Sequence, residues 1–176
     1  MGSIAIQLAK LSGLVVFATA SRPESRKWVL ELGADHVIDH GQPLPEQFRA
    51  QGREGVDYIA NFANTDSYWA AMAELIRPQG KIVSIVENAH PVDLNLLKSK
   101  SAAFIWEFMF TRSMFKTNDI AKQGELLNEI ASLLEAGKLR STHSETLSPI
   151  NAANLRKAHA RLESGRTIGK LVLEGW

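Results

Sequence analysis

The stretch Gly2-Ser3-Ile4-Ala5-Ile6-Gln7-Leu8-Ala9-Lys10-Leu11 decides the fold of this chain. Ile4, Leu8 and Leu11 recur at helical spacing, so the stretch predicts a short helix that begins at a glycine. Ser12-Gly13 ends this helix, and the apolar run 14–18 predicts a buried strand. In dinucleotide-binding folds, a glycine that opens such a helix presents backbone N–H groups to a phosphate. One glycine of the G-x-G-x-x-G pattern does not separate an ordinary first helix from a chain cut inside a phosphate loop.

Short apolar strands alternate with helices over the first 90 residues. We expect helices at about 23–32, 42–51 and 66–76, strands at 37–39, 56–62 and 81–86, and a turn at 78–80. This alternation favours a parallel sheet with helices on both faces. Farther on, the aromatic stretch 102–110 predicts a strand, or a strand that runs into a helix. Two more helices at 119–137 and 150–164 and a closing strand at 168–173 complete the prediction.

Composition excludes several classes of protein. The net charge of +1 gives no long-range field, so we expect neither nucleic acid nor a membrane surface as a partner. No apolar run approaches the roughly 18 residues of a membrane span, and no signal-peptide pattern opens the chain. The chain has no cysteine, and its five histidines lack metal-ligand spacing. We therefore expect a cytoplasmic protein without a metal site.

Five motifs follow one another in the order typical of a single family. They lie at residues 2–10, 32–39, 56–58, 75–81 and 169–173. Together with the stretch Trp106–Arg112, they resemble the medium-chain dehydrogenase/reductase superfamily, in its quinone oxidoreductase-like and zinc-type alcohol dehydrogenase-like branch. The resemblance implies an α/β Rossmann-type domain over residues 1–140. It also implies that residues 141–176 form a helix and a strand that return, in the family, to a catalytic domain.

The same resemblance implies missing parts. The family's N-terminal catalytic domain, the first Rossmann strand and the earlier glycines have no counterpart in this sequence. In the usual strand order the first strand is central, so its loss would leave a gap with exposed strand edges. We expect another segment to fill the gap, either the strand at 168–173 or a second copy of the chain.

The predicted cofactor is NADPH. An acid about 20 positions beyond the glycine motif holds the ribose 2′-hydroxyl of NAD, but Ser21 stands there, with Arg22 and Arg26 close by. A hydroxyl and guanidinium groups suit a 2′-phosphate instead. The alternative is that Ser21 caps a helix and that the two arginines are solvated surface residues.

The remaining candidate contacts follow strand ends or the resemblance. Gly2 and Ser3 would meet the pyrophosphate at the helix start, and the resemblance adds Lys170 there, with Arg166 as second choice. His40 would lie against the adenosine ribose, while Phe62, Asn64 and Val86 stand at the carboxyl edge of the sheet, where ligands bind in open α/β folds. Each of them has an equally ordinary alternative as a loop or turn residue.

These observations predict the NADPH-binding portion of an oxidoreductase that transfers hydride to a quinone or to an activated carbonyl or alkene. We assign no catalytic residue, because hydride transfer is the cofactor's chemistry. We expect the chain alone to be inactive, the parent to bind a small-molecule substrate, and the aromatic stretch 104–110 to favour a homodimer. The alternatives are a non-catalytic NADPH-binding or interaction module and another α/β ligand-binding domain, such as a methyltransferase-like one.

Overall fold

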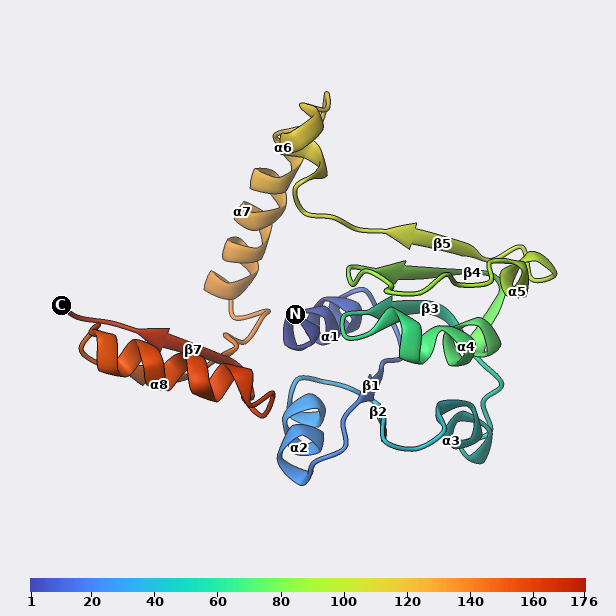
Figure 1. Cartoon of the computed structure of the whole chain (residues 1–176), viewed down its shortest axis with the longest axis horizontal. Helices are drawn as coiled ribbons and strands as arrows, with labels where there is room; N and C mark the ends of the chain where they lie inside the picture. Colours follow the sequence, from blue (N-terminus) through green and yellow to red (C-terminus); the bar gives the residue numbers. More distant parts are fainter. The chain divides into compact units, whose positions relative to one another are not determined.

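The computed structural model describes all 176 residues, which form eight helices and seven strands (Figure 1). The helices are α1 (Gly2–Leu11), α2 (Pro23–Glu31), α3 (Leu44–Ala50), α4 (Thr65–Leu75), α5 (Asn95–Lys98), α6 (Thr111–Phe115), α7 (Lys122–Glu135) and α8 (Ala152–Glu163). The strands are β1 (Phe17–Thr19), β2 (His36–Ile38), β3 (Val56–Asn61), β4 (Ile76–Ser84), β5 (Ala103–Trp106), β6 (His143–Leu147) and β7 (Lys170–Leu173). The chain is therefore an α/β protein, as predicted.

The strands form three sheets rather than one. β1 pairs with β2, β3–β4–β5 form a parallel sheet, and β6 pairs in parallel with β7. The expectation that the strand at 168–173 fills the gap in the Rossmann sheet is wrong, because β7 takes β6 as its partner through the crossover helix α8. Filling of that gap by a second copy stays a prediction.

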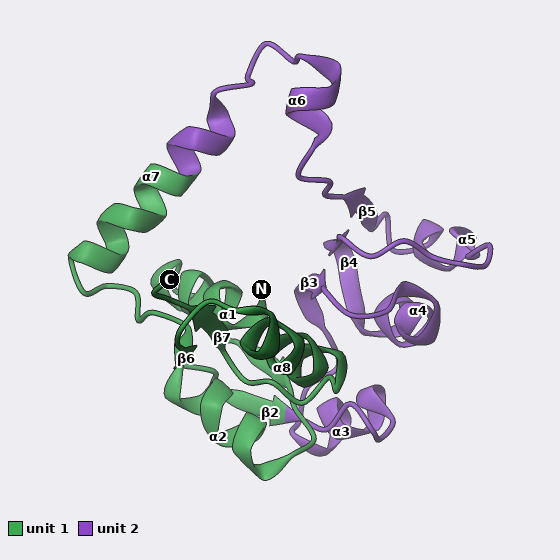
Figure 2. Cartoon of the chain, turned by 60° about the vertical axis from the view of Figure 1, so that its left-hand side comes forward, with its two compact units in different colours: residues 1–37, 127–176 green, residues 38–126 purple.

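The chain divides into two compact units (Figure 2). The first unit comprises residues 1–37 and 127–176, and the second comprises residues 38–126. In the first, Ile6 of α1 packs with Ala18, Leu32 and Ala34. The predicted domain boundary at residue 140 stays a prediction, since compactness is a different criterion from family ancestry.

In the second unit, α4 covers the sheet β3–β4–β5 (Figure 1). Its side chains Trp69 and Met72 pack against Ile76 and Ile82 of β4, and Ile82 has no exposed surface. Burial of one such side chain contributes about 1.5–3 kcal/mol, so this cluster holds α4 and β4 in a fixed relation. This cluster positions the ends of β3 and β4 and the start of α4.

Several element boundaries differ from the predictions. The strand expected at 14–18 begins only at Phe17, and Leu14 and Val15 are exposed. The strand expected from Lys81 begins at Ile76, and the turn lies inside it, where Gln79 adopts a φ of 64°. The aromatic stretch is a strand only to Trp106, and α6 follows after a loop.

Candidate functional site

Three buried polar side chains meet at the carboxyl edge of the sheet in the second unit. Asn61 ends β3, Ser84 ends β4, and Thr65 opens α4. Asn61 and Ser84 are register partners in the parallel ladder, so the pairing itself brings them to one level. Their exposed fractions are 6% for Asn61, 1% for Thr65 and 0% for Ser84. We call these three residues the carboxyl-edge network.

Hydrogen bonds connect every member of this network. The Asn61 amide Nδ2 donates to Thr65 Oγ1 at 2.9 Å and to Ser84 Oγ at 3.0 Å. The Thr65 hydroxyl donates to the carbonyl oxygen of Val86, and Ser84 Oγ lies 3.3 Å from the same oxygen. Since Thr65 has one hydroxyl proton, Ser84 is the donor in its 3.0 Å contact with Thr65. The hydrogen bonds therefore run from Asn61 to Ser84, from Ser84 to Thr65, and from Thr65 to the Val86 carbonyl oxygen.

The loop that follows β4 has a second attachment to α4. Asp66, in the first turn of α4, accepts hydrogen bonds from the backbone N–H groups of Ala89 at 2.8 Å and His90 at 2.9 Å. These two bonds lower the pKa of the Asp66 carboxyl below its usual range, and the positive charge of His90 adds to the effect. The amino end of α4 thus holds the 86–90 loop by Thr65 and by Asp66.

The predicted residues of the second unit lie at or near the strand ends. Phe62 is half-buried just after β3, and Val86 is half-buried after β4, with its carbonyl held by the carboxyl-edge network. Asn64 is the N-cap of α4, where its Oδ1 accepts from Ser67 N at 2.7 Å. His40 is exposed in the turn after β2. Their roles in cofactor binding stay predictions.

In the first unit, Gly2 and Ser3 lie at the amino end of α1. The N–H groups of Gly2 and Ser3 lie in the first helical turn, where no acceptor exists within the helix. The Ser3 hydroxyl accepts from the indole N–H of Trp28 at 3.0 Å. Burial lowers the pKa of the Met1 amino group, and the nearby Lys170 ammonium lowers it further. Lys170 therefore lies close to the amino end of α1, and its role at the pyrophosphate stays a prediction.

Two of the predicted 2′-phosphate residues, Ser21 and Arg22, stand between β1 and α2, and the third, Arg26, lies within α2. Arg22 is the N-cap residue of α2, and its guanidinium donates to the backbone oxygen of Arg166 at 3.1 Å. This bond joins the β1–α2 turn to the backbone of the α8–β7 turn. Arg26 donates to the oxygen of Ala20 at 3.3 Å, and Ser21 is exposed.

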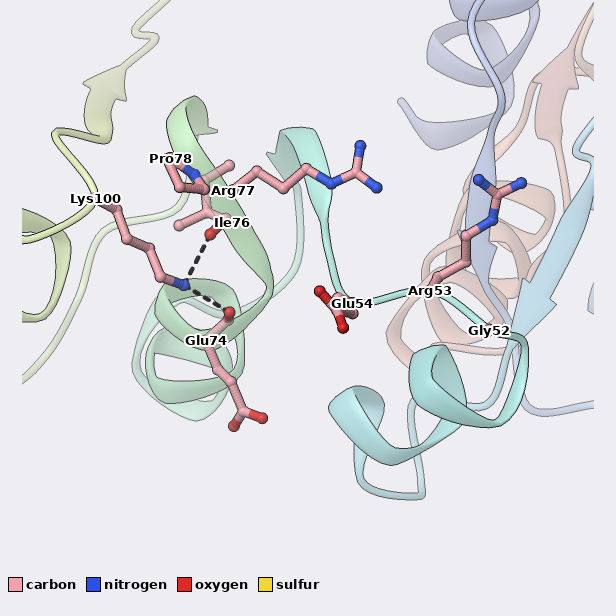
Figure 3. A pocket seen from close by; sticks show the side chains of 8 residues that line it. All are labelled: Gly52, Arg53, Glu54, Glu74, Ile76, Arg77, Pro78 and Lys100. Atoms are coloured by element: carbon pink, nitrogen blue, oxygen red, sulfur yellow. Dashed lines mark hydrogen bonds between the residues drawn. The ribbon is translucent and has the colours of Figure 1, made fainter.

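A pocket of about 550 Å³ opens at the other end of β3 and β4 (Figure 3). Lys100 Nζ in its wall donates to the oxygens of Ala73, Glu74 and Ile76 at 2.7–2.8 Å. The Glu74 carboxylate pairs with Arg49, and Arg77 pairs with Asp57 at 3.1 Å. Most of the charged groups in the pocket wall therefore already bond to other groups of the protein. We assign this pocket to the packing at the carboxyl end of α4 and not to ligand binding.

Sequence reasoning missed the carboxyl-edge network as a unit. Asn61 and Ser84 lie inside the strands predicted at 56–62 and 81–86, and Thr65 precedes the helix predicted from about residue 66. The available signal was a polar residue at the end of each of two successive apolar strands. That signal becomes specific only when the strand register is known, because register decides whether the two side chains meet.

A family model described as zinc-binding dehydrogenase matches residues 32–173. The chain belongs to this family. The match confirms the resemblance to the medium-chain dehydrogenase/reductase superfamily that the motifs indicated.

Individual relatives agree with this placement. A zinc-type alcohol dehydrogenase-like protein of Staphylococcus epidermidis is 43% identical over 173 residues, which are 98% of this chain and 52% of the relative. A solved structure from Rhizobium etli CFN 42, described as a candidate zinc-dependent alcohol dehydrogenase, is 46% identical, with a TM-score of 0.91 over 99% of this chain and 51% of the other. Escherichia coli quinone oxidoreductase, solved with NADPH, has a TM-score of 0.78 at 23% identity, over 98% of this chain and 53% of that one, which shows a shared fold.

This chain spans about half the length of the curated relatives that it matches. None of its helices has the length and apolar character needed to cross a membrane. No three His, Asp or Glu side chains gather in a way that could hold a metal ion.

Proposed function

We propose that this chain is the NADPH-binding part of an oxidoreductase that reduces a quinone or an activated carbonyl or alkene. Membership of the zinc-binding dehydrogenase family supports an oxidoreductase. The observation that carries the choice of cofactor is the Arg22 guanidinium, which donates to the backbone oxygen of Arg166 beside a strand end that has no acid. A cytoplasmic location belongs to the same proposal and rests on the absence of cysteine.

In the first unit, the proposed roles concern the phosphates. The free N–H groups of Gly2 and Ser3 at the amino end of α1 would bind the pyrophosphate, helped by the Lys170 ammonium. Ser21 and Arg22, with Arg26 one helical turn along α2, would bind the 2′-phosphate. Guanidinium groups suit this task because they donate to two phosphate oxygens at once.

In the second unit, the proposed roles concern the ribose and the nicotinamide. His40 would contact the adenosine ribose, and Phe62, Asn64 and Val86 would line the nicotinamide end. The bound cofactor supplies the hydride, so the residues of this chain orient it and exclude water. The substrate would meet the cofactor at the carboxyl edge of the sheet, which is where open α/β sheets bind their ligands.

A titration with NADPH and with NADH, followed by nicotinamide fluorescence, tests this proposal. We expect the chain to bind NADPH at least about tenfold more tightly than NADH, because a hydrogen bond to a charged group contributes about 1.5–3 kcal/mol. Replacement of Arg22 by alanine should remove most of this preference and leave NADH binding unchanged. The matched control is Lys27→Ala, which removes an exposed cation from the same helix and should leave the preference intact.

Equal affinity for the two dinucleotides would contradict the choice of NADPH. Failure to bind either of them would contradict cofactor binding by this chain and favour the alternative of an interaction module. Loss of the preference in Lys27→Ala as well as in Arg22→Ala would show that general positive charge, rather than the Arg22 contact, causes it.

We also propose that the chain forms a homodimer through the end of β5 and the residues that follow it. Large apolar side chains are exposed there, at Trp106, Phe108, Met109, Phe110, Met114 and Phe115, with Phe115 74% exposed. Exposed apolar surface of this extent is typical of an interaction site. The free edge of β5 adds unpaired backbone groups beside it.

Sedimentation velocity at micromolar concentration tests the dimer. We expect a species of twice the mass of the 19.4 kDa chain. Phe110→Ser should shift the population towards the monomer, whereas Leu162→Ser, an exposed apolar residue on α8, should not. A monomeric wild-type chain would contradict the proposal.

A further inference from the structure

We propose that the turn between α8 and β7, residues 164–169, couples the 2′-phosphate of the cofactor to the docking of the C-terminal segment. This name is used for residues 143–176, which contain β6, α8 and β7. The inference rests on the proposed function, because it takes Arg22 as a residue that binds the 2′-phosphate. It adds that the backbone oxygen of Arg166 holds Arg22, so that the bound phosphate and the docked segment stabilise each other.

The C-terminal segment is built mainly on its own contacts. β6 pairs in parallel with β7 and with no other strand, and α8 packs against β7. Near the end of the chain, Ile150 N donates to the oxygen of Gly175 at 2.7 Å. Since neither strand extends a sheet of the remaining chain, side-chain contacts determine where this segment lies against α1 and α2.

Two of these contacts differ in how firmly they hold. The first lies just before the segment, where the Gln7 amide accepts from Arg140 N at 2.7 Å and donates to Arg140 O at 3.1 Å. Gln7 is 8% exposed, so this pair of bonds is largely shielded from water. The second is the single, exposed bond from Arg22 Nη1 to Arg166 O at 3.1 Å. Arg140 is thus a fixed point, and the Arg22 bond is a contact that can form and break.

The bond to Arg166 leaves the other edge of the Arg22 guanidinium unused. A guanidinium carries five N–H donors in one plane, and Arg166 O takes one of them at Nη1. The donors at Nε and Nη2 stay available, and two parallel donors of this kind bind two phosphate oxygens at once. No carboxylate forms an ion pair with Arg22. The contact with Arg166 therefore orients Arg22 without occupying its phosphate-binding edge.

The coupling follows from this orientation. An arginine that is already held loses less conformational freedom when it binds a ligand, so the docked segment favours 2′-phosphate binding. Coupling between two equilibria is reciprocal, so a bound 2′-phosphate favours the docked segment by the same factor. NADPH and NADH are then distinguished by the state of the C-terminal segment as well as by affinity.

Ser164 allows the Arg166 backbone to be disturbed without changing a residue proposed to touch the cofactor. Its hydroxyl donates to Arg161 O at 2.6 Å and accepts from Arg166 N at 3.3 Å, so it ties the turn to the end of α8. Ser164 is therefore a positioning residue in this proposal. The matched control is Ser12→Ala, which removes a similar bond, from the Ser12 hydroxyl to Leu8 O at 2.9 Å, at the end of α1.

Binding of 2′,5′-ADP and of 5′-AMP measures the coupling, since these two nucleotides differ only in the 2′-phosphate. We expect Ser164→Ala to weaken 2′,5′-ADP binding about three- to tenfold, the usual effect of losing one hydrogen bond, and to leave 5′-AMP binding within about twofold. Ser12→Ala should bind both nucleotides as the wild type does. In an Arg22→Lys background, which keeps the charge and removes the paired donors, Ser164→Ala should have no further effect.

Hydrogen exchange followed by mass spectrometry measures the reciprocal effect. In the wild-type chain, peptides that cover residues 164–169 should exchange about three- to tenfold more slowly with saturating 2′,5′-ADP. Saturating 5′-AMP should leave their exchange unchanged. Peptides of α4 serve as internal reference and should respond to neither nucleotide.

The outcomes distinguish this inference from the proposed function. If the wild-type chain binds neither nucleotide, or binds both equally, the proposed choice of cofactor and the inference are both overturned. If the chain prefers 2′,5′-ADP while exchange at 164–169 does not respond, the inference alone is overturned. Equal losses for both nucleotides in Ser164→Ala would also overturn it alone, because they would show a general loss of structure. So would an undiminished effect of Ser164→Ala in the Arg22→Lys background, because Arg22 would then not carry the coupling.

Discussion

At the scale of single residues, the Asp66 carboxylate controls the loop after β4. Its folded-state pKa is depressed, because its charged form accepts the N–H groups of Ala89 and His90. Because the pKa of this carboxyl is lower in the folded state, its charged form stabilises the folded loop at pH values above the unfolded pKa of about 3.8. This stabilisation is lost as the pH falls through the lower, folded-state pKa. We therefore expect the 88–90 loop to loosen below about pH 4.

Hydrogen exchange of the Ala89 and His90 amides measures this effect. Protection in the wild type should fall between pH 5 and pH 3 after correction for the intrinsic exchange rate. In Asp66→Asn, protection should be lower at pH 5 and should change little over the same range. The amides of α8 serve as internal reference. An identical pH dependence in the variant would mean that Asp66 does not hold the loop.

At the scale of elements, Lys100 closes the carboxyl end of α4. Its ammonium donates to the oxygens of Ala73, Glu74 and Ile76, which are left without partners where the helix ends. Its positive charge also suits the negative end of the helix dipole. Lys100→Met should lower the free energy of unfolding by about 1–3 kcal/mol, measured by urea denaturation.

Lys98→Met is the matched control for this prediction. Lys98 is exposed on α5, two residues away, so its replacement should change the free energy of unfolding by less than about 0.5 kcal/mol. Similar losses in both variants would show that net charge, rather than the contacts of Lys100, determines stability here.

Elements with a strong apolar pattern could be predicted from the sequence, and those without one could not. The helices α2, α4 and α8 lie within one or two residues of their predicted ranges. β6 was missed because His143-Ser144-Glu145-Thr146 is polar and pairs only with β7. The strand at 14–18 was placed too early because Leu14 and Val15 are apolar yet exposed.

The site was predictable in position but not in detail. Open parallel sheets bind ligands at the carboxyl ends of their strands, so the fold class predicts a site at the ends of β3 and β4. Val86 is predicted on this ground. The link between Asn61 and Ser84 depends on the β3–β4 register, which the sequence pattern does not determine. The contact between Arg22 and Arg166 spans 144 positions and depends on how two turns pack.

At the scale of the whole molecule, the division into three small sheets predicts uneven stability. A two-stranded sheet is marginally stable by itself, and independent stability needs three or more strands with an apolar face or packing against a helix. We expect slower hydrogen exchange in β3, β4 and β5 than in the pairs β1–β2 and β6–β7. Mass spectrometry of exchanged peptides measures this difference, and uniform protection across the seven strands would contradict it.

The carboxyl-edge network contains an amide and two hydroxyls, and no group that ionises near neutral pH. The orientation of the Val86–Glu87 peptide therefore does not change with pH. The amides of Ala89 and His90, farther along the same loop, are instead held by the Asp66 carboxylate. Mild acid should therefore free the outer part of the loop at Ala89 and His90 while the Val86 carbonyl keeps its hydrogen bonds. The inner part of this loop at Val86 and its outer part at Ala89 and His90 should therefore respond differently to acid.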